Sequence, residues 1–143
     1  MAQVNPYLIF NGNCEAAFLF YKSVFGGEFP YMGKFGDMPS DSEPEMSEED
    51  KNKVMHVTLP IGDGTLLMGS DSNSQSGQVQ FGENVSISIN TTSRAEADKL
   101  FYGLSENGII KMPITDTFWG AYFGMFTDKF GIHWMVNFDE QTQ

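Results

Sequence analysis

Apolar and polar positions in the C-terminal half of the chain follow two distinct periods. From Val85 to Ile89 apolar and polar residues alternate strictly, which predicts a β-strand with one buried face. Apolar residues then recur at helical spacing, behind a capping box that runs from Ser93 to Glu96, and Asn107-Gly108 marks the end of this helix. The apolar helical positions are Ala97, Leu100, Phe101 and Leu104.

The first half of the chain contains a second copy of this pattern. Residues 15–21 read EAAFLFY and residues 96–102 read EADKLFY, with an offset of 81 residues. Residues 54–69 parallel residues 121–136 at an offset of 67 and pair Gly64 with Gly131 and Met68 with Met135. An acidic loop in the first half accounts for the difference between the two offsets. The chain therefore contains two copies of one internal repeat.

Each repeat is predicted to contain a strand, a helix and three further strands. In the first, we expect a strand at Pro6–Phe10, a helix from an Asn13 cap to Val24, and strands near Glu28–Phe35, Lys53–Pro60 and Gly64–Ser70. In the second, we expect Val85–Ile89, the helix after Ser93, and strands near Ile109–Ile114, Trp119–Thr127 and Ile132–Phe138.

The predicted fold class is α+β, built from two tandem βαβββ modules. Module 1 (residues 1–70) and module 2 (residues 82–140) form one domain, joined by a linker over residues 71–81 that is rich in Ser, Gln and Gly. Neither module can cover its own sheet. Side-by-side pairing would give one curved mixed sheet, a half-open barrel with the helices outside and a concave face suited to a small ligand.

The charge of the chain argues against nucleic acid and membranes as partners, and its cysteine content bears on its location in the cell. The net charge is −11 and Arg94 is the only arginine, so no basic cluster is present for nucleic acid or an anionic membrane surface. No apolar stretch is long enough to span a membrane. Cys14 is the only cysteine, so no disulfide can form within the chain, and we expect a cytoplasmic location.

Three segments carry a resemblance to a known family. They are PYLIFNGNCEAAFLFYKSVFGG near the start, HVTLPIGDGTLLMGSD in the middle and TFWGAYFGMFTDKFGIHWMVN at the end. Together they resemble the PhnB-like subgroup of the vicinal oxygen chelate superfamily, which contains glyoxalase I, extradiol dioxygenases, fosfomycin-resistance enzymes and bleomycin-binding proteins. PhnB-like proteins are also labelled as ubiquinone-pathway methyltransferases, but the sequence has no glycine-rich nucleotide loop after a strand.

The resemblance implies a divalent metal site that these residues do not favour. In metal enzymes of the superfamily the ligands are His, Gln or Glu on the first and last strands of each module. Here those positions fall on Pro6, Met68, Asn84 and Met135. Proline has no side-chain donor and thioether sulfur is a poor ligand for hard cations, so we predict no metal and no cofactor.

Two histidines and several aromatic residues are the remaining candidates. By strand alternation His56 should face the concave side, as should His133, while Trp134 should face the helices. Each histidine could instead be a hydrogen-bonded structural residue, and the apolar side chains could simply fill the interior. The predicted ligand-binding residues are His56, Met68, Asn84, Trp119, Phe123, His133 and Met135, with Met125 on the same strand face as Phe123.

The leading hypothesis is a protein that binds a small organic ligand without the usual metal. The acidic loop 37–53 and the net charge favour a cationic ligand, with the loop as either a steering lid or solvated surface. The alternative is a glyoxalase-type lyase or isomerase that acts through His56 or a non-standard metal site. Whether the chain is an enzyme stays open on the sequence alone, and we expect a homodimer.

Overall fold

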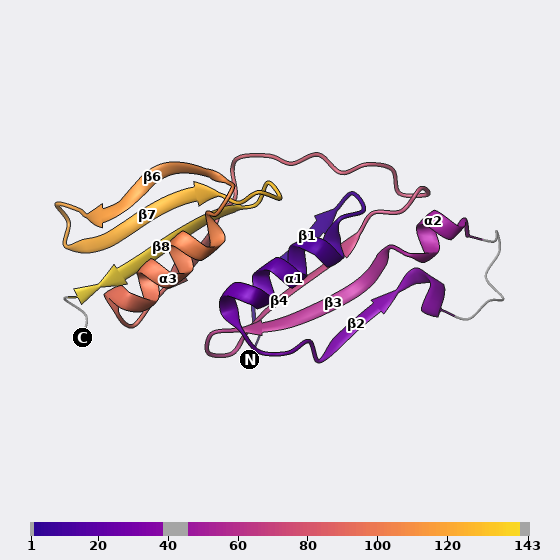
Figure 1. Cartoon of the computed structure of the whole chain (residues 1–143), viewed down its shortest axis with the longest axis horizontal. Coiled ribbons are helices and arrows are strands. Elements are labelled where there is room, and N and C mark those ends of the chain that lie inside the picture. Colours follow the sequence, from indigo (N-terminus) through magenta and orange to yellow (C-terminus); the bar gives the residue numbers. More distant parts are fainter. Residues whose placement is uncertain (1, 39–45, 141–143) are drawn as a thin grey trace. The chain divides into compact units, whose positions relative to one another are not determined.

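A computed structural model describes residues 2–38 and 46–140, and the chain divides into two compact units, Met1–Gln80 and Phe81–Gln143. Each unit contains one four-stranded mixed sheet with a helix lying across one of its faces (Figure 1). The predicted fold class, α+β with two βαβββ modules, is confirmed.

Module 1 forms the sheet order β1-β4-β3-β2. Strand β1 pairs with β4 in parallel, and the other neighbours are antiparallel. A 3-10 turn over Phe35–Asp37 and the short helix α2 lie between β2 and β3. The elements are β1 (Tyr7–Phe10), α1 (Cys14–Phe25), β2 (Tyr31–Lys34), α2 (Glu48–Lys51), β3 (Val54–Ile61) and β4 (Thr65–Asp71).

Module 2 repeats this topology with the order β5-β8-β7-β6. The parallel pair places Ser88 beside Met135, just as Tyr7 lies beside Met68 in module 1. These pairs reproduce the offsets of 81 and 67 residues between the two halves of the sequence. The elements are β5 (Ile87–Asn90), α3 (Arg94–Leu104), β6 (Ile109–Asp116), β7 (Ala121–Thr127) and β8 (His133–Asp139).

The core of each module lies between its helix and one face of its sheet. In module 1, Phe18 and Tyr21 of α1 are fully buried, as are Val57 and Leu59 of β3. In module 2 the predicted helical positions of α3 are buried against β8, where Trp134 is also fully buried. Alternate residues on the strands point the other way and are only half-buried. Each sheet therefore has one face that its own helix leaves uncovered.

The start of α1 differs from the sequence prediction. Asn13 occupies the cap position, but its side chain makes no capping hydrogen bond. Instead Asp71, at the end of β4, accepts hydrogen bonds from the backbone N–H groups of Gly12 and Cys14, each at 2.9 Å. The sequence pattern places Asp71 in the linker, whereas it is the last residue of β4. The buried Asp71 carboxylate also accepts a hydrogen bond from Val54 N–H at 2.9 Å. It therefore caps α1 in place of the Asn13 side chain and connects the helix to β3.

The capping box of α3 forms only in part. The Ser93 hydroxyl accepts a hydrogen bond from Glu96 N–H at 3.0 Å, as predicted. The Glu96 carboxylate accepts from Thr92 N–H at 2.9 Å. The cap therefore extends one residue further toward the N-terminus than the motif indicates.

Candidate functional site

His56 lies on the uncovered face of the module 1 sheet. Its strand neighbour Val57 is fully buried on the helix side, whereas His56 and Thr58 are half-buried. The His56 Nδ1 atom lies 3.1 Å from the Tyr7 hydroxyl, and Nε2 lies 2.9 Å from Thr58 Oγ1. Each hydroxyl can donate or accept, so the imidazole can carry its proton on either nitrogen.

Two tyrosine rings flank this imidazole. The ring centroids of Tyr7 and Tyr31 lie 5.5 Å and 6.0 Å from that of His56. Tyr7 is 44% exposed and Tyr31 is 48% exposed, so both rings are open to solvent. The Tyr31 ring lies over Gly33, where a Cβ atom would collide with the phenol. Glycine at position 33 therefore lets Tyr31 fold over its own strand toward His56.

Backbone pairing places Met68 in the same cluster. Met68 on β4 pairs with Tyr7 on β1 and with Thr58 on β3, and Thr58 pairs in turn with Tyr31 on β2. Directly paired residues project from the same face of a sheet. We call the cluster formed by Tyr7, Tyr31, His56, Thr58 and Met68 the His56 face.

The predicted site residues of module 2 lie in three places. Phe123 and Met135 are half-buried on the uncovered face of the sheet. Trp119, expected on a strand, lies instead in the turn before β7, is 53% exposed, and has its ring centroid 6.1 Å from that of Phe123. Asn84 is exposed and precedes β5. The structure thus brings Trp119 and Phe123 together and leaves Asn84 outside the strands.

His133 has a more restricted environment than His56. Its Nε2 atom lies 2.8 Å from the carbonyl oxygen of Gly82, and Nδ1 lies 2.8 Å from the Thr127 hydroxyl. A carbonyl oxygen only accepts, so Nε2 donates to Gly82, whereas the hydroxyl of Thr127 can either donate to Nδ1 or accept from it. This arrangement supports the structural interpretation of His133 over a role in binding.

The positions expected to hold a divalent ion carry the wrong donors. Met68 and Met135 offer thioether sulfur, and the carbonyl oxygen of Pro6 already accepts a hydrogen bond from Met68 N–H at 3.1 Å. Across residues 2–38 and 46–140, no group of three or more His, Cys, Asp or Glu residues is arranged to hold a metal. The side chains of Pro6, Met68 and Met135 therefore do not fit a hard divalent ion.

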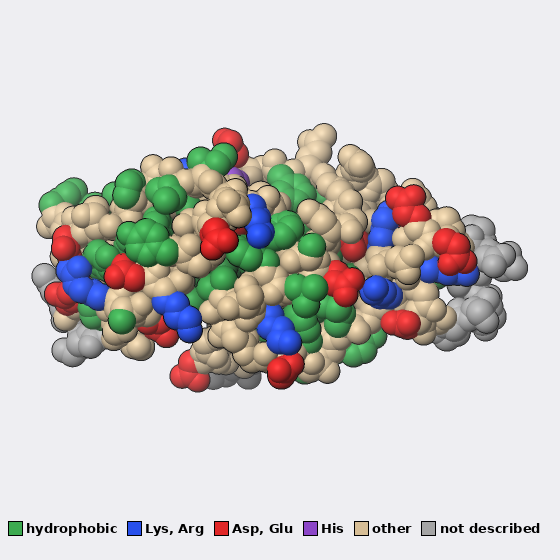
Figure 2. All heavy atoms as spheres, viewed as in Figure 1, with side chains coloured by type: hydrophobic (Ala, Val, Ile, Leu, Met, Phe, Trp, Pro, Cys, Tyr) green, Lys and Arg blue, Asp and Glu red, His purple; other side chains and the backbone are tan. Residues whose placement is uncertain are grey.

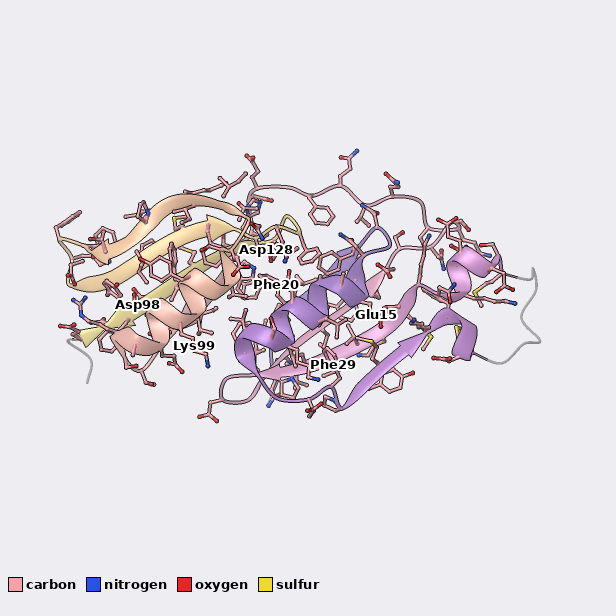
Figure 3. All side chains as sticks on the ribbon, in the orientation of Figure 1. Glu15, Phe20, Phe29, Asp98, Lys99 and Asp128 are labelled. Carbon is pink, nitrogen blue, oxygen red and sulfur yellow. The ribbon has the colours of Figure 1, made fainter. Side chains whose placement is uncertain are left out.

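Carboxylates and a tyrosine surround the single arginine. The Arg94 guanidinium lies 4.3 Å from the Tyr122 ring centroid and donates to Glu140 at 2.6 Å and to Asp116. The Tyr122 hydroxyl donates to Asp98 on α3 at 2.6 Å (Asp98 is labelled in Figure 3). This hydrogen bond is the main cause that raises the pKa of Tyr122 to about 12. The charge of Arg94 is thus already paired with the carboxylates of Glu140 and Asp116.

Sequence reasoning missed Tyr7 and Tyr31 as neighbours of His56. Strand alternation does put residues 56 and 58 on one face, but Thr58 is not among the predicted site residues. The two tyrosines come from other strands, and only the sheet order brings them to His56.

Three residues of the acidic loop, Asp41, Glu43 and Glu45, lie outside the described residues. The role of this loop in steering a ligand stays a prediction. In the view of Figure 2, Lys and Arg side chains are interspersed with Asp and Glu.

Comparisons with known proteins identify a family and two similar proteins. The family described as 3-demethylubiquinone-9 3-methyltransferase matches residues 2–137. Protein YjdN of Escherichia coli K12 is 32% identical over 144 residues, covering 96% of each chain. The crystal structure of protein PA1353 from Pseudomonas aeruginosa is 45% identical, covers 97% of this chain and 98% of its own, and has a TM-score of 0.83.

A more distant structure shows the same fold. The glyoxylase/bleomycin resistance protein/dioxygenase domain from Frankia sp. EAN1pec is 9% identical, with a TM-score of 0.69 over 100% of this chain and 96% of its own. At this identity the likeness concerns the fold alone. Among the described helices, none has the length and apolar character needed to cross a bilayer.

Proposed function

We propose that this protein binds a small organic molecule on the His56 face. The chain belongs to the PhnB-like family described as 3-demethylubiquinone-9 3-methyltransferase, and the proposal proceeds from that membership. Binding uses neither the divalent ion of related metal enzymes nor another cofactor. The observation that carries the proposal is the placement of two solvent-exposed tyrosine rings beside the His56 imidazole. Aromatic rings at such distances can pack against a planar ligand.

The chemistry of the His56 face favours a flat ligand that carries a positive charge. The net charge of the chain is −11, which raises the local concentration of cations. Electron-rich phenol faces also attract cations directly. Met68 adds a flexible, polarisable side chain that adapts to the outline of a ligand. A cytoplasmic location is part of the proposal, and a lone, buried Cys14 thiol is compatible with it.

A ligand screen with two variants tests the proposal. We expect planar aromatic cations to bind more tightly than neutral compounds of the same shape in equilibrium dialysis. Met68→Trp should block binding while the protein stays folded, since Met68 lies on an uncovered face. His56→Ala should weaken binding by removing the central ring. Leu19→Ala, at an exposed position on α1, is the control and should bind as the unaltered protein does.

Two results would contradict the proposal. One is that no planar compound binds, and the other is that Met68→Trp binds as well as the unaltered protein. Thermal melts provide a third test. If Met68→Trp lowers the free energy of unfolding by about 1–3 kcal/mol, the Met68 side chain is packed in an interior. The His56 face would then be closed to a ligand, which also contradicts the proposal.

A glyoxalase-type lyase or isomerase is the second candidate, favoured by the hydrogen bonds of His56. An imidazole between two hydroxyl groups can take up a proton on one nitrogen and release one from the other. The test is turnover of the hemithioacetal of methylglyoxal and glutathione. Turnover that disappears in His56→Ala would favour the enzyme over the binding protein.

Methyl transfer, which the family description names, receives no support from the turn between β1 and α1. Turns between a strand and a helix that hold a nucleotide use free backbone N–H groups for this purpose. Here the N–H groups of Gly12 and Cys14 both donate to Asp71. They are therefore not available to a ligand.

A further inference from the structure

Three methionines stand side by side on adjacent strands of module 2. Met135 on β8 pairs directly with Met125 on β7, and Met125 pairs with Met112 on β6. All three side chains are half-buried. We call Met112, Met125 and Met135 the methionine row.

The methionine row lies on the face of the sheet that α3 leaves uncovered. Met125 alternates with Gly124 and Phe126, which are buried on the helix side. Met135 likewise alternates with the buried Trp134 and Val136. An irregularity in β6 between residues 110 and 112 brings Met112 into register with Met125. Paired residues share a face, so the three thioethers project from the same side.

We propose that the methionine row binds a soft monovalent metal ion of the Cu(I) class. Thioether sulfur is a ligand that selects Cu(I) over hard cations. Each methionine side chain has three rotatable bonds, so sulfurs from neighbouring strands can turn toward one ion above Met125. The same donor chemistry that makes Met135 unsuitable for a hard divalent ion makes the row suitable for a soft one.

The cysteine thiol and the two histidine rings among the described residues are already buried or hydrogen-bonded. Cys14 is fully buried, and burial is the main cause that raises the pKa of its thiol, so the thiolate does not form near neutral pH. Both ring nitrogens of His133 have hydrogen-bond partners, as do those of His56. The inference does not depend on the His56 face, because it rests on residues of module 2 alone.

Calorimetric titration with Ag(I), a redox-inert probe for Cu(I), tests the site in chloride-free buffer. We expect one equivalent to bind to the unaltered protein. Met125→Leu removes the central sulfur at nearly constant volume and should raise the dissociation constant at least about tenfold. Met32→Leu is the matched control, since Met32 is also half-buried on a strand but pairs with Val57. It should bind as the unaltered protein does, and so should Cys14→Ser.

Methyl NMR locates the ion independently. Of the nine methionines, those of the methionine row should shift on addition of Ag(I), while Met32 should not. The proposal is overturned if no stoichiometric ion binds, if Met125→Leu binds as tightly as the unaltered protein, or if Cys14→Ser abolishes binding. Circular dichroism of Met125→Leu shows whether this variant keeps the fold. If it does not, the NMR shifts of the unaltered protein alone decide whether the ion binds at the methionine row.

Discussion

At the residue scale, Tyr122 shows how one neighbour sets the titration of a side chain. Its hydroxyl donates to the Asp98 carboxylate, and this bond stabilises the protonated phenol. The pKa of Tyr122 is raised to about 12, first by that hydrogen bond and then by burial and the charge of Asp98, while Arg94 acts in the opposite direction. We expect one of the five tyrosines to titrate near that pH in an ultraviolet absorbance titration.

The sign of the effect on stability follows from this direction. The pKa in the folded state exceeds the ordinary tyrosine value of about 10. The stabilising contribution of Tyr122 is therefore complete below about pH 10 and is lost as the pH rises toward about 12. Tyr122→Phe should remove the late-titrating phenol, and Asp98→Asn should lower its pKa. Tyr31→Phe is the control, and a titration that loses the late phenol there instead would contradict the assignment.

At the element scale, Asp71 connects three segments of module 1. Its carboxylate accepts from Gly12 and Cys14 at the start of α1 and from Val54 at the start of β3. Asp71→Asn places an amide N–H group against a backbone donor and leaves a buried group unpaired. We expect a loss of about 2–4 kcal/mol in the free energy of unfolding, measured in urea.

The matched control for this prediction is Asp63→Asn. Asp63 is exposed in the turn between β3 and β4. Its replacement should change the free energy of unfolding by no more than about 0.5 kcal/mol. Equal effects of the two substitutions would mean that Asp71 does not connect these elements.

At the scale of the whole molecule, we expect a homodimer. Each sheet taken alone has two edge strands, whose backbone groups can pair with another chain. The net charge of −11 per chain opposes association, and added salt screens that repulsion. Sedimentation at micromolar concentration should show twice the 16.0 kDa mass of one chain, with tighter association as salt increases. A monomer at every salt concentration would contradict this prediction.

The sequence by itself determined the elements and their repetition. The helical spacing before Leu104 and the alternation in Val85–Ile89 depend only on residues a few positions apart, so they can be interpreted locally. The strand nevertheless begins two residues later than predicted, at Ile87, and Val85 is exposed. The offset of 67 residues also pairs Met68 with Met135, and both residues occupy equivalent places beside the parallel strands. The alternation of His133, Trp134 and Met135 along one strand also predicts that Trp134 faces the helix, and Trp134 is fully buried there.

Only the tertiary structure decided which side chains meet. Tyr7 and His56 are 49 residues apart, and Cys14 and Asp71 are 57 residues apart. Such contacts depend on the sheet order β1-β4-β3-β2, which no local pattern contains. The two histidines therefore looked alike in the sequence, yet one lies between two hydroxyl groups and the other donates to a carbonyl oxygen. Short-range periodicity determines strands and helices, whereas the partners of each polar atom depend on how distant strands are brought together.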